Sequence, residues 1–295
     1  MDSSADGRIE APTRDDLPRY EAMLSEIRRM GSAVIAFSGG VDSSFLLHAA
    51  KEALGDRVLA VTAASPTYPR SEREEALRLA RSWGVAHRLV ESNELEIPGF
   101  SANPPDRCYH CKKKLFGILA GIAREEGYAA VCDGSNADDR NAFRPGRRAA
   151  GELSVRSPLL ENGLGKPAIR RLSRSFGLPT ADRGSFACLS SRFPYGTTID
   201  EESLRRVEAC EEVLRGFGFR QFRVRVHDAV ARIEVGTDEI PRLFEPEISG
   251  VIHERFRENG FLYVSVDIRG YRTGSMNDGL PASTRGLVAG PPEDL

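Results

Sequence analysis

The sequence lacks any apolar run that approaches the 18 residues typical of a membrane-spanning helix. It also lacks an excess of charge of one sign, because 41 basic and 43 acidic residues leave a formal net charge of −2. Such a balance argues against a surface dedicated to nucleic acid. The polar N-terminus has no apolar segment of the kind found in signal peptides. We therefore expect neither a membrane nor a nucleic acid as a partner.

Cysteine is scarce, with five residues, an odd number that does not suit a disulfide framework. A reducing cytoplasm is the expected compartment. No second CxxC pair accompanies Cys108 and Cys111, so this pair supplies half of a four-ligand zinc site at most. The stretch CYHCKKK leaves open a redox dithiol, a zinc site completed by His110 and a third cysteine, and an iron–sulfur cluster held by three thiolates. Cys132, after an apolar strand, and Cys210, in an amphipathic helix, are expected to be packing residues.

Short apolar runs alternate with amphipathic segments over the first two thirds of the chain. Strands that alternate with helices at this pitch predict a parallel sheet, and hence an α/β fold with right-handed crossovers. The expected strands are 34–37, 58–62, 86–90 and 129–132, and the expected helices are 42–53, 71–83, 106–126 and 166–176.

The pattern changes toward the C-terminus, where a helix, two strands, a helix and a strand follow one another. The expected ranges are 201–214, 221–227, 231–235, 247–259 and 261–267. This order predicts a small antiparallel α+β layer. We predict a disordered leader at 1–18, a nucleotide-binding domain at 19–195, a smaller α+β domain at 196–279 and a mobile tail at 280–295.

The octet FSGGVDSS, residues 37–44, lies between an apolar strand and a helix. Its glycines permit a tight turn, and the unpaired N–H groups of the helix start favour a phosphate or pyrophosphate. The octet has no lysine of the Walker A type. Asp42 either helps to hold Mg²⁺ or caps the helix, and both possibilities remain open. The predicted phosphate-binding residues are Ser38, Gly39, Gly40, Asp42, Ser43 and Ser44.

This octet resembles the PP-loop ATP pyrophosphatases, whose fold is Rossmann-like and of the adenine nucleotide alpha hydrolase type. The resemblance implies an enzyme that adenylates a carbonyl oxygen and then lets a nucleophile displace AMP. Ala63 ends the second expected strand, where ligands bind in open parallel sheets. We predict that Ala63, together with Asp133 and Gly134 in the turn after the fourth strand, contacts ATP.

Further motifs lie outside the octet: CDGSNADD (132–139), RSPLLE (156–161), RLSRSFGLPTAD (171–182), FACLSSRFPYG (186–196) and GYRTGSMN (270–277). Together these motifs resemble the LarE family, ATP-dependent sulfur transferases that build the nickel-pincer nucleotide cofactor. The resemblance covers about residues 20–278. It implies that the substrate is pyridinium-3,5-biscarboxylic acid mononucleotide, whose carboxylates become thiocarboxylates.

The resemblance implies two sulfur sources. In one branch of the family, the cysteine that matches Cys188 gives up its own sulfur and becomes dehydroalanine. In the other branch, it joins a CxxC pair to hold a [4Fe-4S] cluster that carries the sulfur. Cys108, Cys111 and Cys188 match the second branch, with sulfide or another sulfur donor as partner, and three thiolates leave one iron of such a cluster open. Sacrifice of Cys188 is the alternative.

An anionic mononucleotide needs cations, and guanidinium groups suit carboxylates and phosphates. Arg223 and Arg225 share one strand face, and the resemblance implies a phosphate site there, formed with neighbouring subunits of a homo-oligomer. The alternative is a solvated strand face. Arg192 and Glu208 are further candidates, although a solvated helix face suits Glu208 equally well. The basic stretch 140–148 is expected to be a mobile surface loop.

Lys112, Lys113 and Lys114 are expected to form a solvated helix face. Three rival functions stay open. A tRNA thiolase would need a basic surface or an RNA-binding module, which the balanced charge disfavours. A zinc- or redox-regulated nucleotide-binding module would show no turnover. An amidotransferase-like synthetase would need an ammonia source.

Overall fold

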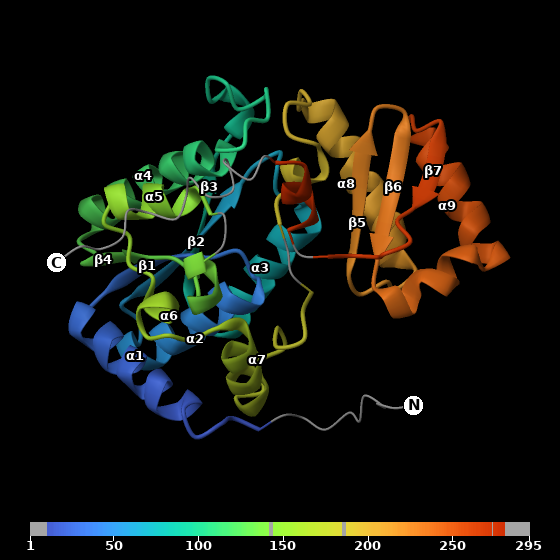
Figure 1. The fold of residues 1–295 in the computed structure, drawn as a ribbon. Helices are drawn as coiled ribbons and strands as arrows, with labels where there is room; N and C mark the ends of the chain where they lie inside the picture. Colours follow the sequence, from blue (N-terminus) through green and yellow to red (C-terminus); the bar gives the residue numbers. More distant parts are fainter. Residues whose placement is uncertain (1–10, 142–143, 185–186, 273, 281–295) are drawn as a thin grey trace.

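A computed structural model of the protein describes residues 11–141, 144–184, 187–272 and 274–280. Its described part contains two sheets, one in each half of the chain (Figure 1). The first sheet is parallel, with strand order β3-β2-β1-β4, so the predicted α/β, Rossmann-like class is confirmed. Its strands are β1 (Ala33–Ala36), β2 (Val58–Ala64), β3 (Ala86–Glu91) and β4 (Ala130–Cys132).

Helices cover both faces of this sheet because its strand residues alternate between two cores. Ala33 and Ile35 of β1 pack into the core of α1, α2, α3 and α7, whereas Val34 packs into the core of α4 and α5 on the other face. Figure 1 shows α4 and α5 above the sheet and α1, α2 and α7 below it. The helices of this half are α1 (Asp16–Met30), α2 (Val41–Leu54), α3 (Arg70–Ser82), α4 (Arg107–Glu126), α5 (Gly146–Glu152), α6 (Pro158–Glu161) and α7 (Lys166–Ser175).

The second sheet has strand order β5-β6-β7 and corrects one prediction. Strands β5 and β6 are antiparallel, but β6 and β7 are parallel, so the layer is mixed and not purely antiparallel. The physical reason is the connection: α9 carries the chain back, so that β7 can run alongside β6 in the same direction. The elements are α8 (Glu201–Gly216), β5 (Phe222–His227), β6 (Val230–Val235), α9 (Pro246–Glu258) and β7 (Tyr263–Val266).

Short 3₁₀ helices complete the described structure at Glu94–Glu96, Ala137–Asn141, Leu189–Arg192, Thr237–Phe244 and Ser275–Gly279. The predicted basic loop at 140–148 is wrong in part, because α5 already begins at Gly146. The predicted leader is also too long, because α1 begins at Asp16, whose carboxylate accepts a hydrogen bond from Thr13 N and pairs with Arg171. Residues 1–10 and 281–295 lie outside the described residues. None of the described helices is both long and apolar enough to cross a membrane.

The two halves are held together by charged contacts. Glu72 on α3 pairs with Arg215 on α8, while Glu208 and Glu212 of α8 accept hydrogen bonds from Arg70 N and Ser71 Oγ at the start of α3. Apolar packing also crosses the predicted boundary at 195, because Leu189 and Phe193 belong to the core of the second sheet. The domain limits themselves stay a prediction.

Candidate functional site

The phosphate loop joins β1 to α2. Gly39 has φ +66°, and the helix starts after Gly40, whose backbone is extended. Ser38 and Ser43 face each other, with their Oγ atoms 3.1 Å apart, and Ser43 Oγ donates to Gly40 O at 3.2 Å. Ser44 N donates to Gly40 O at 2.9 Å. The loop is therefore closed by its own hydroxyls and backbone, and the N-terminus of a 14-residue helix opens on it.

Asp42 lies in the first turn of α2 and does not cap it, because the N-cap is Gly40 and has no side-chain bond. Its Oδ2 atom accepts from Lys166 Nζ, and Asn136 also acts on the carboxylate through a side-chain hydrogen bond. Its buried Oδ1 atom, like Ser44 Oγ nearby in sequence, has no well-formed hydrogen bond among the described residues. Burial raises the pKa of Asp42, although Lys166 opposes this shift. These two oxygens at the phosphate loop suit Mg²⁺ and phosphate, which bind oxygen and hydroxyl groups.

The turn after β4 touches the phosphate loop. A Cβ atom on Gly134 would lie 3.0 Å from Ser43 N and 3.1 Å from Ser43 Cα, so only glycine permits this approach. Asp133 is buried and accepts from Ser157 Oγ at 2.7 Å and from Lys112 Nζ at 3.0 Å. Burial alone would raise the pKa of Asp133, but Lys112 and these hydroxyl bonds hold it below its ordinary value. The turn is thus a rigid second wall beside the loop, at the point where the strand order reverses.

Ala63 lies half-buried near the end of β2, in register with Val90 of β3. That position is at the carboxyl edge of the sheet, as the sequence predicts. Its contact with adenosine stays a prediction.

Cys108 and Cys111 lie in the first turns of α4. Desolvation raises the pKa of the Cys111 thiol well above its ordinary value, and the charges of Glu94, Cys188 and Cys108 raise it further. Desolvation and the neighbouring Cys188 likewise raise the pKa of Cys108, although this residue still reaches the surface. The three cysteines that the sequence singled out are therefore close enough to influence one another. All five cysteines are free thiols.

Hydrogen bonds fix the loop that carries Cys188. Leu189 N donates to Thr67 O at 2.8 Å, which ties the loop to the segment after β2. Asn103, which precedes α4, donates from Nδ2 to the carbonyl oxygens of Phe193 and Pro194 at 3.2 and 2.7 Å. The chain thus brings Cys188 to the start of α4.

The three cysteines lie in one region, but their side chains are not arranged around a single metal ion. The mutual effects of the three cysteines place their sulfurs in one neighbourhood. As the side chains stand, however, no group of three or more His, Cys, Asp or Glu residues in the described part of the chain is arranged to hold a metal ion. His110 lies 3.4 Å from Asp106 through its Nε2 atom, so nothing here supports the zinc alternative.

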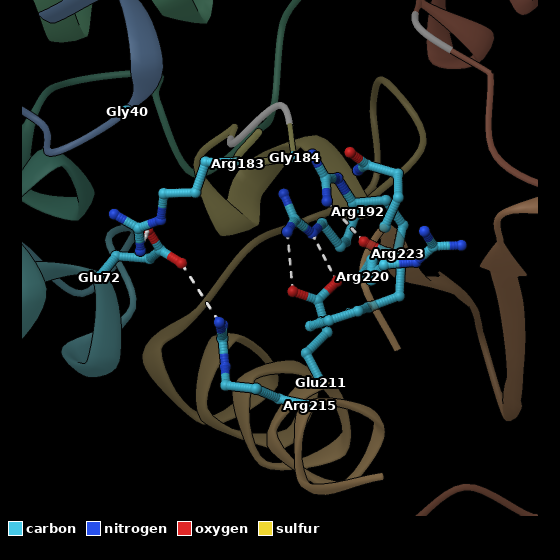
Figure 2. A pocket seen from close by; sticks show the side chains of 11 residues that line it. Gly40, Glu72, Arg183, Gly184, Arg192, Glu211, Arg215, Arg220 and Arg223 are labelled. Carbon is cyan, nitrogen blue, oxygen red and sulfur yellow. Dashed lines mark hydrogen bonds and ion pairs between the residues drawn. The ribbon is translucent and has the colours of Figure 1, made fainter. Parts of the chain in front are cut away.

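Arginines line a pocket between the two halves. Figure 2 shows Glu72 between Arg183 and Arg215 on one side, and Glu211 facing Arg192 on the other. The pocket begins at Gly40 of the phosphate loop and extends to the second sheet. Its lining residues are Gly40, Glu72, Arg183, Gly184, Arg192, Glu211, Arg215, Arg220, Gln221, Phe222 and Arg223. Its five guanidinium groups against two carboxylates suit an anionic ligand.

Arg192 connects this pocket to the cysteine loop. It is fully buried and makes a bidentate pair with Glu211, at 2.8 and 2.7 Å, while its Nη1 atom donates to the carbonyl oxygen of Cys188 at 3.0 Å. Burial alone would raise the pKa of Glu211, but Arg192, Arg223 and the N–H of Val224 hold it below its ordinary value. Arg192 therefore positions the backbone of the Cys188 loop.

Arg223 and Arg225 are 5% and 4% exposed, so the alternative of a solvated strand face is wrong. Burial, with repulsion from Arg192, lowers the pKa of Arg223 to about 10. Arg223 lines the pocket, whereas Arg225 pairs with Glu234 at 2.8 Å and donates to Ser191 O at 2.7 Å. The structure thus separates the roles of two residues that the sequence treats alike.

Glu208 does not join these arginines in any contact that the described residues show. It accepts a hydrogen bond from Arg70 N at 2.6 Å, and Glu211, one turn further along α8, is the carboxylate in the pocket. Sequence reasoning missed Glu211, Arg183 and Glu72, for which no local pattern gives a signal. It also underrated Lys112, which bonds Asp133 and does not form a purely solvated face.

Two known proteins match this chain over most of its length. The chain is 41% identical over 261 residues to the uncharacterized protein slr1717 of Synechocystis sp., a match that covers 87% of this chain and 97% of the relative. It is 36% identical over 260 residues to the pyridinium-3,5-bisthiocarboxylic acid mononucleotide synthase of Lactiplantibacillus plantarum, covering 88% and 92% of the two chains. A glutamine-hydrolyzing GMP synthase chain of Methanococcus maripaludis is 28% identical over 180 residues, 55% of this chain and 56% of its own. No protein-family model matches the chain.

Proposed function

Because the chain belongs to the LarE family of the PP-loop ATP pyrophosphatase superfamily, we propose that it is an ATP-dependent sulfur transferase. Its proposed substrate is pyridinium-3,5-biscarboxylic acid mononucleotide, and its product is the corresponding thiocarboxylate. One observation carries the proposal: hydrogen bonds from Asn103 tie the Cys188 loop to the start of α4, where Cys108 and Cys111 lie. Lys112, next to Cys111, binds the turn that touches the phosphate loop.

The first step is adenylation. A substrate carboxylate oxygen attacks the α-phosphorus of ATP, an O–P bond forms, and pyrophosphate leaves. The phosphate loop is suited to hold that pyrophosphate through its backbone N–H groups, the dipole of α2 and the hydroxyls of Ser38, Ser43 and Ser44. Asp42 is the candidate carboxylate for Mg²⁺, since its Oδ1 atom is buried and has no well-formed hydrogen bond among the described residues.

The arginine pocket is the candidate substrate site. It extends from Gly40 to Arg223, so a mononucleotide bound there would have anionic groups at one end and a carboxylate near the phosphate loop at the other. Arg215 and Arg220 are partly exposed and can turn toward a phosphate, whereas Arg192 is committed to Glu211. Ala63, Asp133 and Gly134 are the proposed walls of the ATP site.

The second step replaces AMP by sulfur. Hydrosulfide attacks the acyl carbon, a C–S bond forms, the C–O bond to AMP breaks, and the hydrosulfide proton leaves to solvent. A [4Fe-4S] cluster, when bound, supplies an iron with an open position for sulfur. Cys108, Cys111 and Cys188 are the residues that would hold it. Their proximity supports this assignment, although their side chains would have to turn toward one centre.

The alternative is the single use of the Cys188 sulfur. Cys188 is half-buried, and its carbonyl is fixed by Arg192, so the residue has a defined place from which to act. The formal net charge of −2 gives a tRNA thiolase no support. We place the reaction in the cytoplasm, because free thiols need a reducing compartment. The expected homo-oligomer, with a phosphate site shared between subunits, remains a prediction.

Single-turnover assays on alanine variants test the proposal. With iron, sulfide, ATP, Mg²⁺ and the pyridinium substrate supplied anaerobically, we expect Cys108→Ala and Cys188→Ala to lose cluster absorbance and about 10³-fold of thiocarboxylate formation. Cys210→Ala, in the core of the second sheet, is the matched control and should retain both.

The sacrificial route gives a different result. Cys108→Ala would then still form one thiocarboxylate per chain, and mass spectrometry would show the loss of H₂S from Cys188. Wild-type protein that forms neither AMP nor thiocarboxylate would contradict the proposed function as a whole.

A further inference from the structure

Arg107, the first residue of α4, is a buried cation without a charged partner. It is 4% exposed, and two of its guanidinium nitrogens, Nε and Nη1, are buried and have no hydrogen-bond partner in the part of the chain that the structure describes. Its guanidinium carbon lies 4.7 Å from the centre of the Tyr195 ring. No carboxylate among the described residues forms an ion pair with it, unlike the buried Arg192 and Arg225, which pair with Glu211 and Glu234.

A buried guanidinium in this state is costly. A charge removed from water needs an opposite charge and hydrogen-bond acceptors, and the face of a tyrosine supplies a part of this compensation. A side chain left unsatisfied in this way in a native protein calls for an explanation, such as a catalytic role or a bound ion or water molecule. A small hydrogen-bond acceptor would complete the surroundings of Arg107.

The surroundings indicate which acceptor that is. Arg107 is adjacent to Cys108, and the electrostatic effects of Cys108 and Cys188 reach Tyr195, on which Arg107 stacks. Lys112 and Arg144 also act on Cys108, so positive groups converge on the thiols. The N-terminus of the 20-residue helix α4 adds its positive end. Arg107, Lys112 and Arg144 thus act on Cys108, while the buried carboxylate of Glu94 acts on Cys111.

Size excludes the large substrate as the partner of Arg107. Arg107 does not line the arginine pocket, whose own guanidinium groups serve the phosphate and carboxylates of a mononucleotide. The two unpartnered nitrogens of Arg107 are buried, so a partner for them has to be small, and neighbouring side chains have to move to admit it. Hydrosulfide is small and carries a negative charge.

We propose that Arg107 binds hydrosulfide beside the three cysteines and so concentrates the sulfur donor at the site. This inference rests on the proposed sulfur transfer. It assigns to Arg107 a binding role and not a chemical step.

Charge-selective alkylation of the protein without iron tests the site directly. Iodoacetate is an anion, iodoacetamide is neutral, and the same thiolate attacks both reagents. The ratio of the two alkylation rates therefore reports a nearby anion site and cancels differences in thiolate population. Peptide mass spectrometry gives this ratio at Cys108 and at Cys188.

We expect Arg107→Gln to lower the ratio about five-fold at both cysteines and Arg107→Lys to restore most of it. Arg124→Gln, on the exposed last turn of α4, is the matched control and should leave it unchanged. An unchanged ratio in folded Arg107→Gln overturns the proposal.

Steady-state kinetics with sodium sulfide give the second readout. We expect Arg107→Gln to raise KM for sulfide about ten-fold while KM for the pyridinium substrate stays within two-fold. A rise in KM for the pyridinium substrate alone would assign Arg107 to the substrate carboxylate and overturn the proposal. If the wild-type protein transfers no sulfur, the proposed function fails, but the alkylation ratio still decides whether Arg107 forms an anion site.

Discussion

The phosphate loop and the cysteine site are stabilised by different forces. The phosphate loop is held by short-range bonds among hydroxyls and backbone and by the close approach of Gly134 to Ser43. The cysteine loop is held by a fully buried ion pair, Arg192–Glu211, and lies beside the unpaired charge of Arg107. Both regions contain buried polar atoms without a well-formed hydrogen bond among the described residues: neutral or acidic oxygens of Ser44 and Asp42 in the first, and the cationic guanidinium of Arg107 in the second. Steric changes should therefore damage the first region, and charge changes should damage the second.

The largest expected effect is on the cysteine side. Glu211→Gln removes the negative charge that faces the fully buried Arg192, so we expect the free energy of unfolding to fall by about 3–5 kcal/mol in chemical denaturation. Replacement of both partners, Arg192→Met with Glu211→Leu, should recover part of this loss because both charges of the pair are removed together. Glu258→Gln removes an exposed pair and should cost less than about 1 kcal/mol. Equal losses in Glu211→Gln and Glu258→Gln would remove the distinction between the two regions.

An intermediate effect is expected from a single methyl group on the phosphate side. Gly134→Ala forces a Cβ atom against the backbone of Ser43, so we expect ATP pyrophosphatase activity to fall about 10²-fold. Gly121→Ala, within α4, meets no atom within 4 Å and should raise stability by about 0.5–1 kcal/mol with activity unchanged. Pyrophosphate release is the measurement, and full activity in Gly134→Ala would show that the turn is not a rigid wall.

The smallest effect is expected from the ion pair of Lys112 and Asp133, beside the phosphate loop. Lys112 lowers the pKa of Asp133, so the ionised carboxylate stabilises the fold above the ordinary pKa, near 4, and this contribution is lost as pH falls through the lowered value. Lys112 is partly exposed, so Lys112→Met should cost about 1 kcal/mol at pH 7. The difference from wild type should stay constant down to about pH 5 and shrink below pH 4. A difference that grows in acid would contradict the assignment.

Periodicity in the sequence was sufficient for the first half of the fold. Apolar runs separated by amphipathic segments predicted β1 to β4 and the helices between them. The signal was strongest for β1 and β2, which are buried on both faces, whereas the edge strand β3 is largely exposed. It was insufficient for the direction of β7, since strand direction depends on the path of α9 and not on the residues of β7. The same limit applies to helix α8. Glu208 and Glu211 lie one turn apart on similar faces, and the position of Arg192, set by tertiary packing, decides which of them is buried.

The pattern FRVRVH also could not predict that its two arginines are buried. Alternation places Arg223 and Arg225 on one face, but their burial depends on Ser191, Glu234 and Tyr271, which lie far away in the sequence. The cysteines were easier to predict because their chemistry marks them individually. Arg107 stood next to Cys108 and gave no signal, since an unpaired buried charge is recognised from its three-dimensional surroundings alone.

Apolar side chains anchor the Cys188 loop, and this limits where two related chains can be joined in a chimera. Leu189, Phe193 and Ile199 pack into the core of the second sheet, whereas Leu189 N and Asn103 tie the same loop to the first half. A chimera joined at residue 195 would separate Leu189 and Phe193 from the core in which they pack. A unit exchanged between related chains should therefore begin before Cys188, so that Cys188 moves together with the C-terminal half.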